Sequence, residues 1–351
     1  NGGFTVSIYV VKVIKQFRIR EEAMKKRLNE KVLKRGDVIL TTSDAKISKI
    51  IRATTISPIS HAMLYVDDCS VIDATKDGVH SANTQRLFFE QHDAVFVLRL
   101  EGELPPPTSI KICNYVRERI GSEYATLEAG RAWQGLGKKG TRKQFCSRLV
   151  AQAYAANGFD LVKNTDFCTP NELLKSVKLV EVVDATVDVT DEEYQTWQTH
   201  PSGLDLMRQS TNHILNGARK IDKSIQHLSD VDKLVLEHPE HDETIMQLYV
   251  ESGYLHVWET GHEINPWHYD PKLMEDLGSR QPNDVRWYCK STLSEGSRTD
   301  NRYVTNANTY QYYQSMRPRQ TIVMLTAFYH MLAENHVNRL DVAEDWLTRH
   351  P

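Results

Sequence analysis

The chain has 351 residues, of which 40% are hydrophobic and 25% charged, a composition typical of a globular protein long enough for two domains. The net charge of −3, without a basic stripe on a folded segment, argues against a nucleic-acid-binding protein, so we expect no nucleic-acid partner. No run of about 18 apolar residues occurs, so the sequence contains no complete membrane span.

Residues 1–33 are the first predicted segment, a helix that begins apolar and becomes basic. Residues 1–36 contain ten Lys and Arg against three Glu, about +7, so the remainder carries about −10 (−3 − 7). Such a stretch fits an interfacial helix, or the basic stop after a membrane anchor. The alternative is a packing helix with a solvated face. If the segment is an interfacial helix or follows an anchor, we expect the protein to be associated with a membrane; secretion into a target cell is the alternative localisation that we expect.

Residues 34–190 are predicted to form an α+β domain, with a small antiparallel sheet packed on helices. Its β-rich runs are separated by turn residues, and its helices carry capping signals such as the Thr-Pro-x-Glu start at Thr169. Residues 191–351 are predicted to form a mainly helical accessory domain. The predicted strands are 34–42, 59–66, 70–75 and 94–100, and the predicted helices of the first domain are 44–54, 108–121, 146–158 and 169–176.

The cysteines and histidines do not form a recognisable metal motif. The number of cysteines is five, their spacing is wide and no C-x-x-C occurs, which fits neither a disulfide framework nor a zinc ribbon. His256, His262, Glu263 and His268 are close in sequence, but they do not make an H-E-x-x-H motif. We interpret them as a structural aromatic and histidine cluster, and we expect neither metal nor cofactor.

Cys146 stands directly before an apolar helical repeat of Leu149, Val150 and Ala153. A thiol at a helix N-terminus lies at the positive end of the helix dipole, which stabilises a thiolate. The backbone N–H groups there, including that of Ser147, point outward and can hold an oxyanion. The alternative for Cys146 is a buried structural cysteine.

His61 opens a β-rich run directly after "ISPIS", where a side chain can project from the end of a sheet. With a three-residue loop of Asp67–Cys69, Met63 faces Asp73 in the hairpin that follows. Asp73 then lies diagonal to His61, where a carboxylate can orient the imidazole; a two-residue loop would put it on the opposite face. Tyr65 shares this face and is expected to line the pocket. The alternative for Asp73 is a turn or edge residue.

In chain order, "RGDVIL", "SHAMLYV", "VIDAT" and "FCSRLV" resemble the circularly permuted branch of the NlpC-type papain-like superfamily. That branch includes YiiX/YebB-like bacterial proteins and lecithin retinol acyltransferase-like enzymes. The resemblance covers roughly residues 34–180 and implies a permuted papain-like domain with Cys146 as nucleophile, His61 as base and Asp73 as orienting residue. Cys69 stands where the hairpin usually has Gly, and Asp73 is shorter than the Glu or His often found there.

The resemblance implies a cysteine-dependent acyl hydrolase or acyltransferase that works through a thioester. The basic, apolar N-terminal stretch favours phospholipid ester deacylation at a lipid or membrane surface, in which case a bacterial antibacterial toxin with an immunity protein as partner is one expected role. The first alternative is a peptidoglycan stem-peptide amidase or endopeptidase. The second is a non-catalytic binding module that retains the fold.

Overall fold

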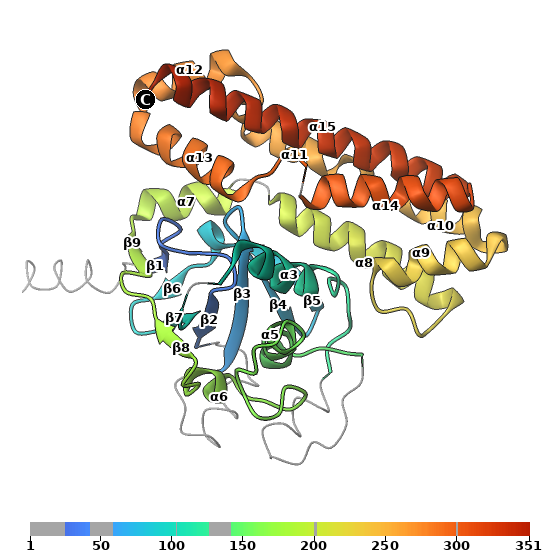
Figure 1. Ribbon diagram of the computed structural model, residues 1–351, viewed down its shortest axis with the longest axis horizontal. Coiled ribbons are helices and arrows are strands. Elements are labelled where there is room, and N and C mark those ends of the chain that lie inside the picture. Colours follow the sequence, from blue (N-terminus) through green and yellow to red (C-terminus); the bar gives the residue numbers. More distant parts are fainter. Residues whose placement is uncertain (1–24, 43–58, 103, 126–141, 200–201, 300) are drawn as a thin grey trace, which may run out of the picture. The chain divides into compact units, whose positions relative to one another are not determined.

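The computed structural model describes residues 25–42, 59–102, 104–125, 142–199, 202–299 and 301–351 (Figure 1). The helix expected at 44–54 and most of the N-terminal helix lie outside these residues. The chain divides into two compact units. The first comprises the residues up to 117 together with 123–200, and the second comprises 118–122 together with the residues from 201 onward.

A six-stranded sheet organises the described part of the first unit, and its neighbouring strands all run antiparallel. The sequence predicted four of these strands because each alternates or concentrates apolar residues between turn signals. Each edge strand, β5 and β8, was missed. In spatial order the strands are β5 (Gly78–Asn83), β4 (Ser70–Thr75), β3 (His61–Asp67), β2 (Val38–Thr41), β7 (Val95–Leu100) and β8 (Leu179–Glu181).

A second, three-stranded sheet has the order β6 (Phe89–Glu90), β1 (Lys25–Leu28) and β9 (Thr186–Val189). Strand β1 corrects the prediction that the N-terminal helix extends to residue 33. Lys25 forms an ion pair with Glu90, and the backbone of β1 pairs with both neighbouring strands. These long-range partners override the helical preference of a Lys- and Arg-rich stretch, since such local preference is a weak prior.

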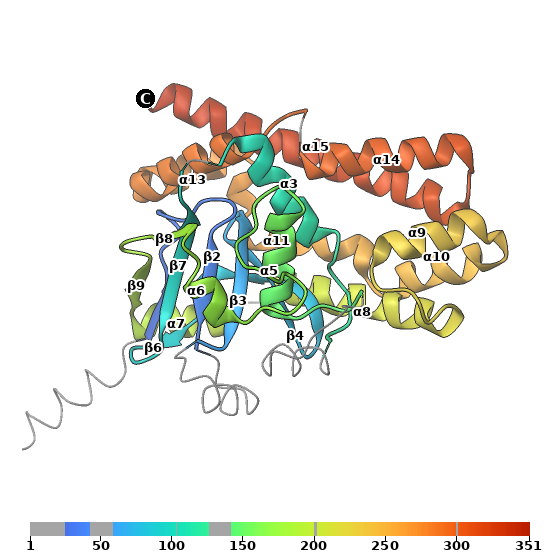
Figure 2. The ribbon, with the colours of Figure 1, turned by 60° about the horizontal axis from the view of Figure 1, so that its bottom comes forward.

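The helices of the first unit begin close to their predicted starts. Helix α3 (Pro106–Arg117) starts within the three prolines, because the first turn of a helix has no use for their missing N–H groups. Helix α6 (Pro170–Leu174) has the predicted capping box between Thr169 and Glu172. Helices α3 and α5 (Cys146–Ala155) contact each other and β3 (Figure 2). The short 3₁₀ helix η1 spans Thr84–Arg86.

Helix α7 (Asp191–Thr199) places the end of the first unit about ten residues beyond the predicted boundary at 190. The ring of Tyr194 packs edge-on against Phe88 at 4.9 Å, and Glu193 forms an ion pair with Arg27 at 2.6 Å. Helix α7 therefore packs on the first unit. Its polar sequence did not indicate this packing.

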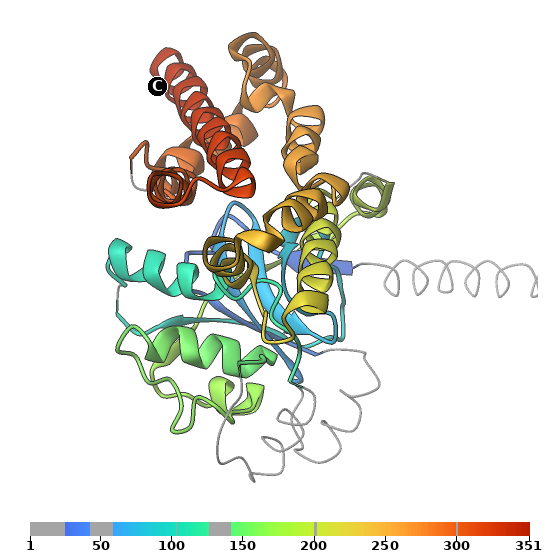
Figure 3. The same ribbon diagram turned by 90° about the vertical axis from the view of Figure 1, so that its right-hand side faces the viewer.

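The second unit is helical, as predicted. Its helix α14 packs against one part of the longer helix α15 (Figures 1 and 3). None of the helices in the described ranges is both long and apolar enough to cross a membrane. The elements are α8 (Gly203–Ile221), α9 (Leu228–Glu237), η2 (Pro239–His241), α10 (Asp242–Glu251), η3 (Tyr254–His256), α11 (Val257–Ile264), η4 (Pro266–His268), α12 (Pro271–Arg280), α13 (Pro282–Glu295), α14 (Arg302–Met316) and α15 (Gln320–Arg349).

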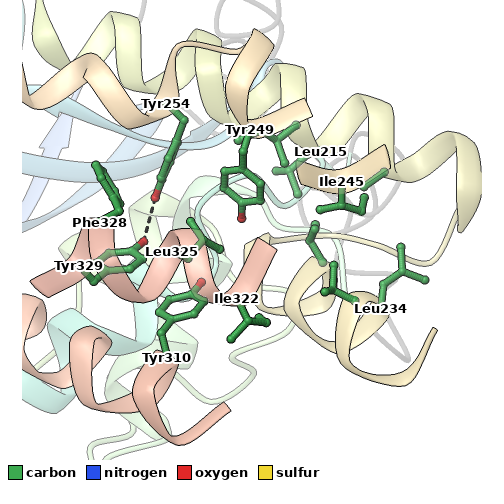
Figure 4. Close-up of a cluster of buried hydrophobic side chains, with 14 of the residues drawn as sticks. Leu215, Leu234, Ile245, Tyr249, Tyr254, Tyr310, Ile322, Leu325, Phe328 and Tyr329 are labelled. Atoms are coloured by element: carbon green, nitrogen blue, oxygen red, sulfur yellow. Dashed lines mark hydrogen bonds between the residues drawn. The ribbon is translucent and has the colours of Figure 1, made fainter. Parts of the chain in front are cut away.

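The core of the second unit is rich in tyrosine (Figure 4), and the buried carboxyl group of Asp232 is hydrogen-bonded to it. Both oxygens of Asp232 accept a hydrogen bond from the Tyr310 hydroxyl, each at 3.0 Å. The Tyr310 ring stacks on Tyr329 at 4.9 Å, and the Tyr329 hydroxyl bonds to that of Tyr254 at 2.9 Å. Burial raises the pKa of Asp232 to about 7, although the bond from Tyr310 opposes this shift. The core therefore disfavours the charged form of Asp232.

We predict that Asp232→Asn stabilises the second unit at pH 8 but not at pH 4. The folded-state pKa of Asp232, about 7, exceeds the ordinary value, so its unfavourable contribution grows as pH rises from about 4 to 7. Relief of this penalty is worth at most about 4 kcal/mol, at about 1.4 kcal/mol per tenfold change in proton affinity. Thermal melting of the whole chain at both pH values measures it. The control Asp284→Asn, at an exposed residue, should change little, and equal effects of Asp232→Asn at both pH values would contradict the prediction.

Candidate active site

The β3–β4 hairpin decides whether His61 and Asp73 can meet. The observed register pairs Tyr65 with Val71 and Met63 with Asp73, as the sequence predicted. The predicted three-residue loop is wrong: Asp67 pairs with Ser70, and the turn consists of Asp68 and Cys69, whose φ angles are +45° and +53°. A bulge between Tyr65 and Asp67 adds one residue to β3, which restores the facing that a two-residue turn alone would reverse.

The imidazole of His61 is hydrogen-bonded to Asp73. His61 Nε2 lies 2.6 Å from Asp73 Oδ2, and the two side chains are 18% and 8% exposed. Since Nε2 is used by the carboxylate, Nδ1 is the ring nitrogen left to face another group. The short Asp side chain therefore reaches the histidine, because the diagonal position of the pair brings it close.

Cys146 is the first residue of α5, where the sequence placed it. Its side chain is 6% exposed, and the helix begins after Phe145, whose backbone is extended. Two backbone hydrogen bonds between the segment 123–125 and Gln144, at 2.8 and 2.9 Å, fix the chain just before the helix. The buried Arg148 guanidinium adds bonds to the carbonyl oxygens of Lys143 and Asp166, both at 2.8 Å. The approach to Cys146 is therefore rigidly held.

His61 and Cys146 interact electrostatically. Burial lowers the pKa of His61, but hydrogen bonds to Asp73 and to Cys146 outweigh burial and raise it to about 10. An imidazolium that forms at neutral pH between a carboxylate and a thiolate is the arrangement that activates a cysteine nucleophile. The structure thus brings together Cys146, His61 and Asp73 from α5, β3 and β4.

Two other predicted site residues have different surroundings. The Ser147 hydroxyl donates a hydrogen bond to the carbonyl oxygen of Cys168 at 2.7 Å, so only its backbone N–H, in the first turn of α5, remains suited to an oxyanion. Tyr65 is 3% exposed and packs in an apolar cluster with Met63 and Val71. This packing corrects the expectation that Tyr65 lines the pocket. Tyr65 lies on the same face of β3 as His61, but it is farther along the strand and is part of the apolar core.

Tyr124 is a site residue that the sequence reasoning missed. Burial raises the pKa of Tyr124 above its ordinary value, and the negative charges of Cys146 and Asp73 raise it further. Its backbone pairs with Gln144, two residues before Cys146, in an isolated parallel bridge. No local motif announces this contact, because Tyr124 and Cys146 are separated by the whole of residues 126–141. The Tyr124 phenol therefore keeps its proton at neutral pH, so that it can donate a hydrogen bond.

His80 on β5 is a second missed residue, on the far side of Asp73. The two residues pair directly across β4 and β5, and His80 Nε2 lies 3.6 Å from Asp73 Oδ1. Its strand was not predicted from the sequence, so neither was its position. Asp73 therefore lies between two histidines.

The histidines of residues 256–268 form ring stacks. His262 stacks on Tyr269 at 3.6 Å between ring centres, and His268 stacks on Tyr288 at 4.1 Å. His256 pairs with Glu259 instead, at 2.8 Å. Within the described residues, no group of three or more His, Cys, Asp and Glu side chains is arranged to hold a metal ion.

We predict that iodoacetamide modifies Cys146 before the other cysteines at pH 6.5, by at least about tenfold. Burial raises the pKa of Cys113 and of Cys289 to about 12 and raises that of Cys168 as well, so these thiols stay protonated. Peptide mapping by mass spectrometry measures the order of labelling. His61→Ala should remove the advantage of Cys146, whereas equally rapid labelling of the partly exposed Cys69 would contradict an activated Cys146.

We predict that Asp73→Asn lowers the midpoint at which His61 loses its proton, from about 10 by at least about 1 pH unit. The carboxylate stabilises the imidazolium, so its removal makes the proton easier to lose. An NMR titration of the His61 ring measures the midpoint without a substrate. The matched control Asp77→Asn changes an exposed residue in the turn between β4 and β5, and an unchanged midpoint in Asp73→Asn would rule out Asp73 as the stabilising group.

Comparison with known proteins locates the domain. Residues 32–182, less than half of the chain, match the family described as "permuted papain-like amidase enzyme, YaeF/YiiX, C92 family". The crystal structure of the metalloprotein yiiX from Escherichia coli O157:H7 is 16% identical, with a TM-score of 0.30, over 43% of this chain and 97% of that one. No curated protein matches the chain.

The match and the fold agree on the kind of domain. Residues 32–182 form a permuted papain-like domain, the domain of a cysteine hydrolase. A mainly helical C-terminal region follows it. This confirms the predicted α+β class and the predicted permuted papain-like domain. The comparisons give no support to the lecithin retinol acyltransferase-like branch.

Proposed function

We propose that the first unit is a cysteine amidase that cleaves amide bonds in the stem peptides of peptidoglycan. In this proposal Cys146 is the nucleophile, His61 the base and acid, and Asp73 the residue that orients His61. The observation that carries it is the placement of His61 between the Asp73 carboxylate, at 2.6 Å, and the thiol that begins α5.

The first step forms a thioester. The Cys146 thiolate attacks the amide carbonyl carbon, and the carbonyl oxygen becomes an oxyanion. The N–H groups of the first turn of α5, including that of Ser147, have no partner within the helix and can stabilise this charge. The Tyr124 hydroxyl, which keeps its proton beside Cys146, is a further donor for the substrate. His61 then gives its proton to the departing amine as the C–N bond breaks.

The second step releases the acid. A water molecule takes the place of the amine, and His61, now neutral, accepts a proton from it as it attacks the thioester. The carboxylic acid leaves, and the thiolate and imidazolium are restored. The hydrogen bond from His61 Nε2 to Asp73 holds the ring in one orientation through both steps, so that Nδ1 serves each proton transfer.

Amide cleavage is supported better than ester cleavage. The matched family is described as an amidase, and it gives no support to phospholipid deacylation or to a toxin with an immunity protein. The site also suits an amide, because an amine is a poor leaving group until it is protonated. His61, with its pKa raised to about 10, holds that proton at neutral pH.

We predict that the purified chain releases new amino groups from peptidoglycan, and that Cys146→Ala does not. Mass spectrometry of muropeptides after incubation identifies the bond, since each amide hydrolysis adds one water to the products. Loss of the nucleophile should reduce the rate by at least about a thousandfold.

Phospholipid vesicles form the parallel arm of that experiment. Fatty acid released by the wild type and not by Cys146→Ala would overturn the amidase proposal in favour of a lipid esterase. A wild type that is labelled at Cys146 but cleaves neither substrate would favour a binding module that retains the fold.

A further inference from the structure

In the part of the chain that the structure describes, one oxygen of the Asp73 carboxylate, Oδ1, lacks a hydrogen-bond donor. Asp73 Oδ2 is occupied by His61, whereas Oδ1 is buried and has no hydrogen-bond partner within the described residues. A buried carboxylate oxygen without a donor is costly. His80 Nε2, at 3.6 Å, is the ring atom that faces this oxygen.

The other nitrogen of His80 fixes the protonation of the ring. His80 Nδ1 lies 3.2 Å from the carbonyl oxygen of Gly78, which can only accept, so Nδ1 must carry a hydrogen. In a neutral ring Nε2 would then present a lone pair to the Asp73 carboxylate. Two electron-rich atoms would face each other in a site where His80 and Asp73 are 9% and 6% exposed. A second proton on Nε2 converts this repulsion into an ion pair.

We propose that His80 is a positioning residue of the catalytic site, present as an imidazolium that holds Asp73 from behind and moderates its charge toward His61. The inference rests on the proposed function, since it concerns the same site. It adds a fourth ionisable member to the group of Cys146, His61 and Asp73. The geometry that carries it is the direct pairing of Asp73 with His80 across β4 and β5.

Among the described residues, Asp73 is the charged group recorded in an ion pair with His80. Asp73 on β4 is the titratable group paired with it, and beyond Asp73 lie His61 on β3, Cys146 on α5 and Tyr124. Lys76 and Asp77, in the turn between β4 and β5, are exposed and of opposite sign. The charge on His80 therefore acts mainly through Asp73.

A positive charge behind Asp73 has a definite effect on the reactive pair. It favours the thiolate of Cys146, which then forms at lower pH, and it disfavours the imidazolium of His61, which then loses its proton at lower pH. Removing the charge should move both events to higher pH. Two unit charges roughly 8 Å apart at an effective dielectric constant of about 20 shift a titration on the order of 1 pH unit.

The pH dependence of Cys146 alkylation by iodoacetate tests the proposal without a substrate. The anionic reagent is attracted to an imidazolium beside the thiolate, so the rate rises as the thiolate forms and falls as His61 loses its proton. In His80→Gln, whose amide can still donate to Asp73, we expect both limbs to move upward by about 1 pH unit. His92→Gln, at a side chain 84% exposed, is the matched control and should leave both limbs in place.

A merely structural role would produce a different profile. If His80 only packed against Asp73, its loss would weaken the support for the ion pair. The acid limb would then rise while the alkaline limb fell, and the bell would narrow. Either this narrowing or unchanged limbs in His80→Gln would overturn the proposal. If the wild type gave no bell-shaped profile, Cys146 and His61 would not form a thiolate–imidazolium pair. That result would overturn both the proposed function and this inference.

A second measurement uses the wild type and does not depend on the variant's activity. ¹⁵N–¹H NMR of the histidine rings at pH 7 distinguishes an imidazolium from a neutral ring, and the His80 ring signals are assigned in the wild type through bonds from its backbone resonances. We expect both nitrogens of His80 to be protonated. A neutral ring, protonated only at Nδ1, would overturn the proposal even if His80→Gln failed to fold.

Discussion

The site depends on the facing of one hairpin. Side chains alternate across a strand, so a single extra or missing residue between His61 and Asp73 would send the carboxylate to the other face of the sheet. The two-residue turn at Asp68 and Cys69 would by itself place Asp73 on the face opposite His61. The bulge between Tyr65 and Asp67 shifts the register by one residue and returns Asp73 to the face of His61. The contact between His61 and Asp73, and through it the orientation of the ring toward Cys146, follows from this compensation.

The sequence could predict those parts of the site that local signals specify. An apolar repeat after Cys146 and a capping box at Thr169 fix helix starts, and both helices are found there. The register of β3 and β4 was predicted correctly although the predicted loop was wrong. The facing of the side chains depends only on the number of residues between the paired positions, and a two-residue turn plus one bulge residue gives the same number as a three-residue loop. The resemblance places Cys69 where the family's hairpin usually has Gly, and the backbone of Cys69 is left-handed there, the conformation that favours Gly.

What the sequence could not predict comes from contacts between distant segments. Tyr124 approaches Cys146 through a backbone bridge across residues 126–141, and His80 meets Asp73 through a strand that lacks an apolar pattern. Strand β1 exists because β6 and β9 flank it, although its own residues favour a helix. In each case the partner supplies the stabilisation, and no window of neighbouring residues contains it.

The order of charges explains how so polar a group remains buried. A lone ion in a protein interior costs several kcal/mol, and burial is repaid only when every charge has a close partner. With His80 as the proposed imidazolium, Cys146, His61, Asp73 and His80 alternate in sign, so each charge has an opposite neighbour and the net charge is zero. When the Cys146 thiolate attacks, its negative charge passes to the oxyanion at the start of α5, and His61 no longer faces a thiolate. The loss of the thiolate, which had stabilised the proton on His61, favours transfer of that proton to the departing amine.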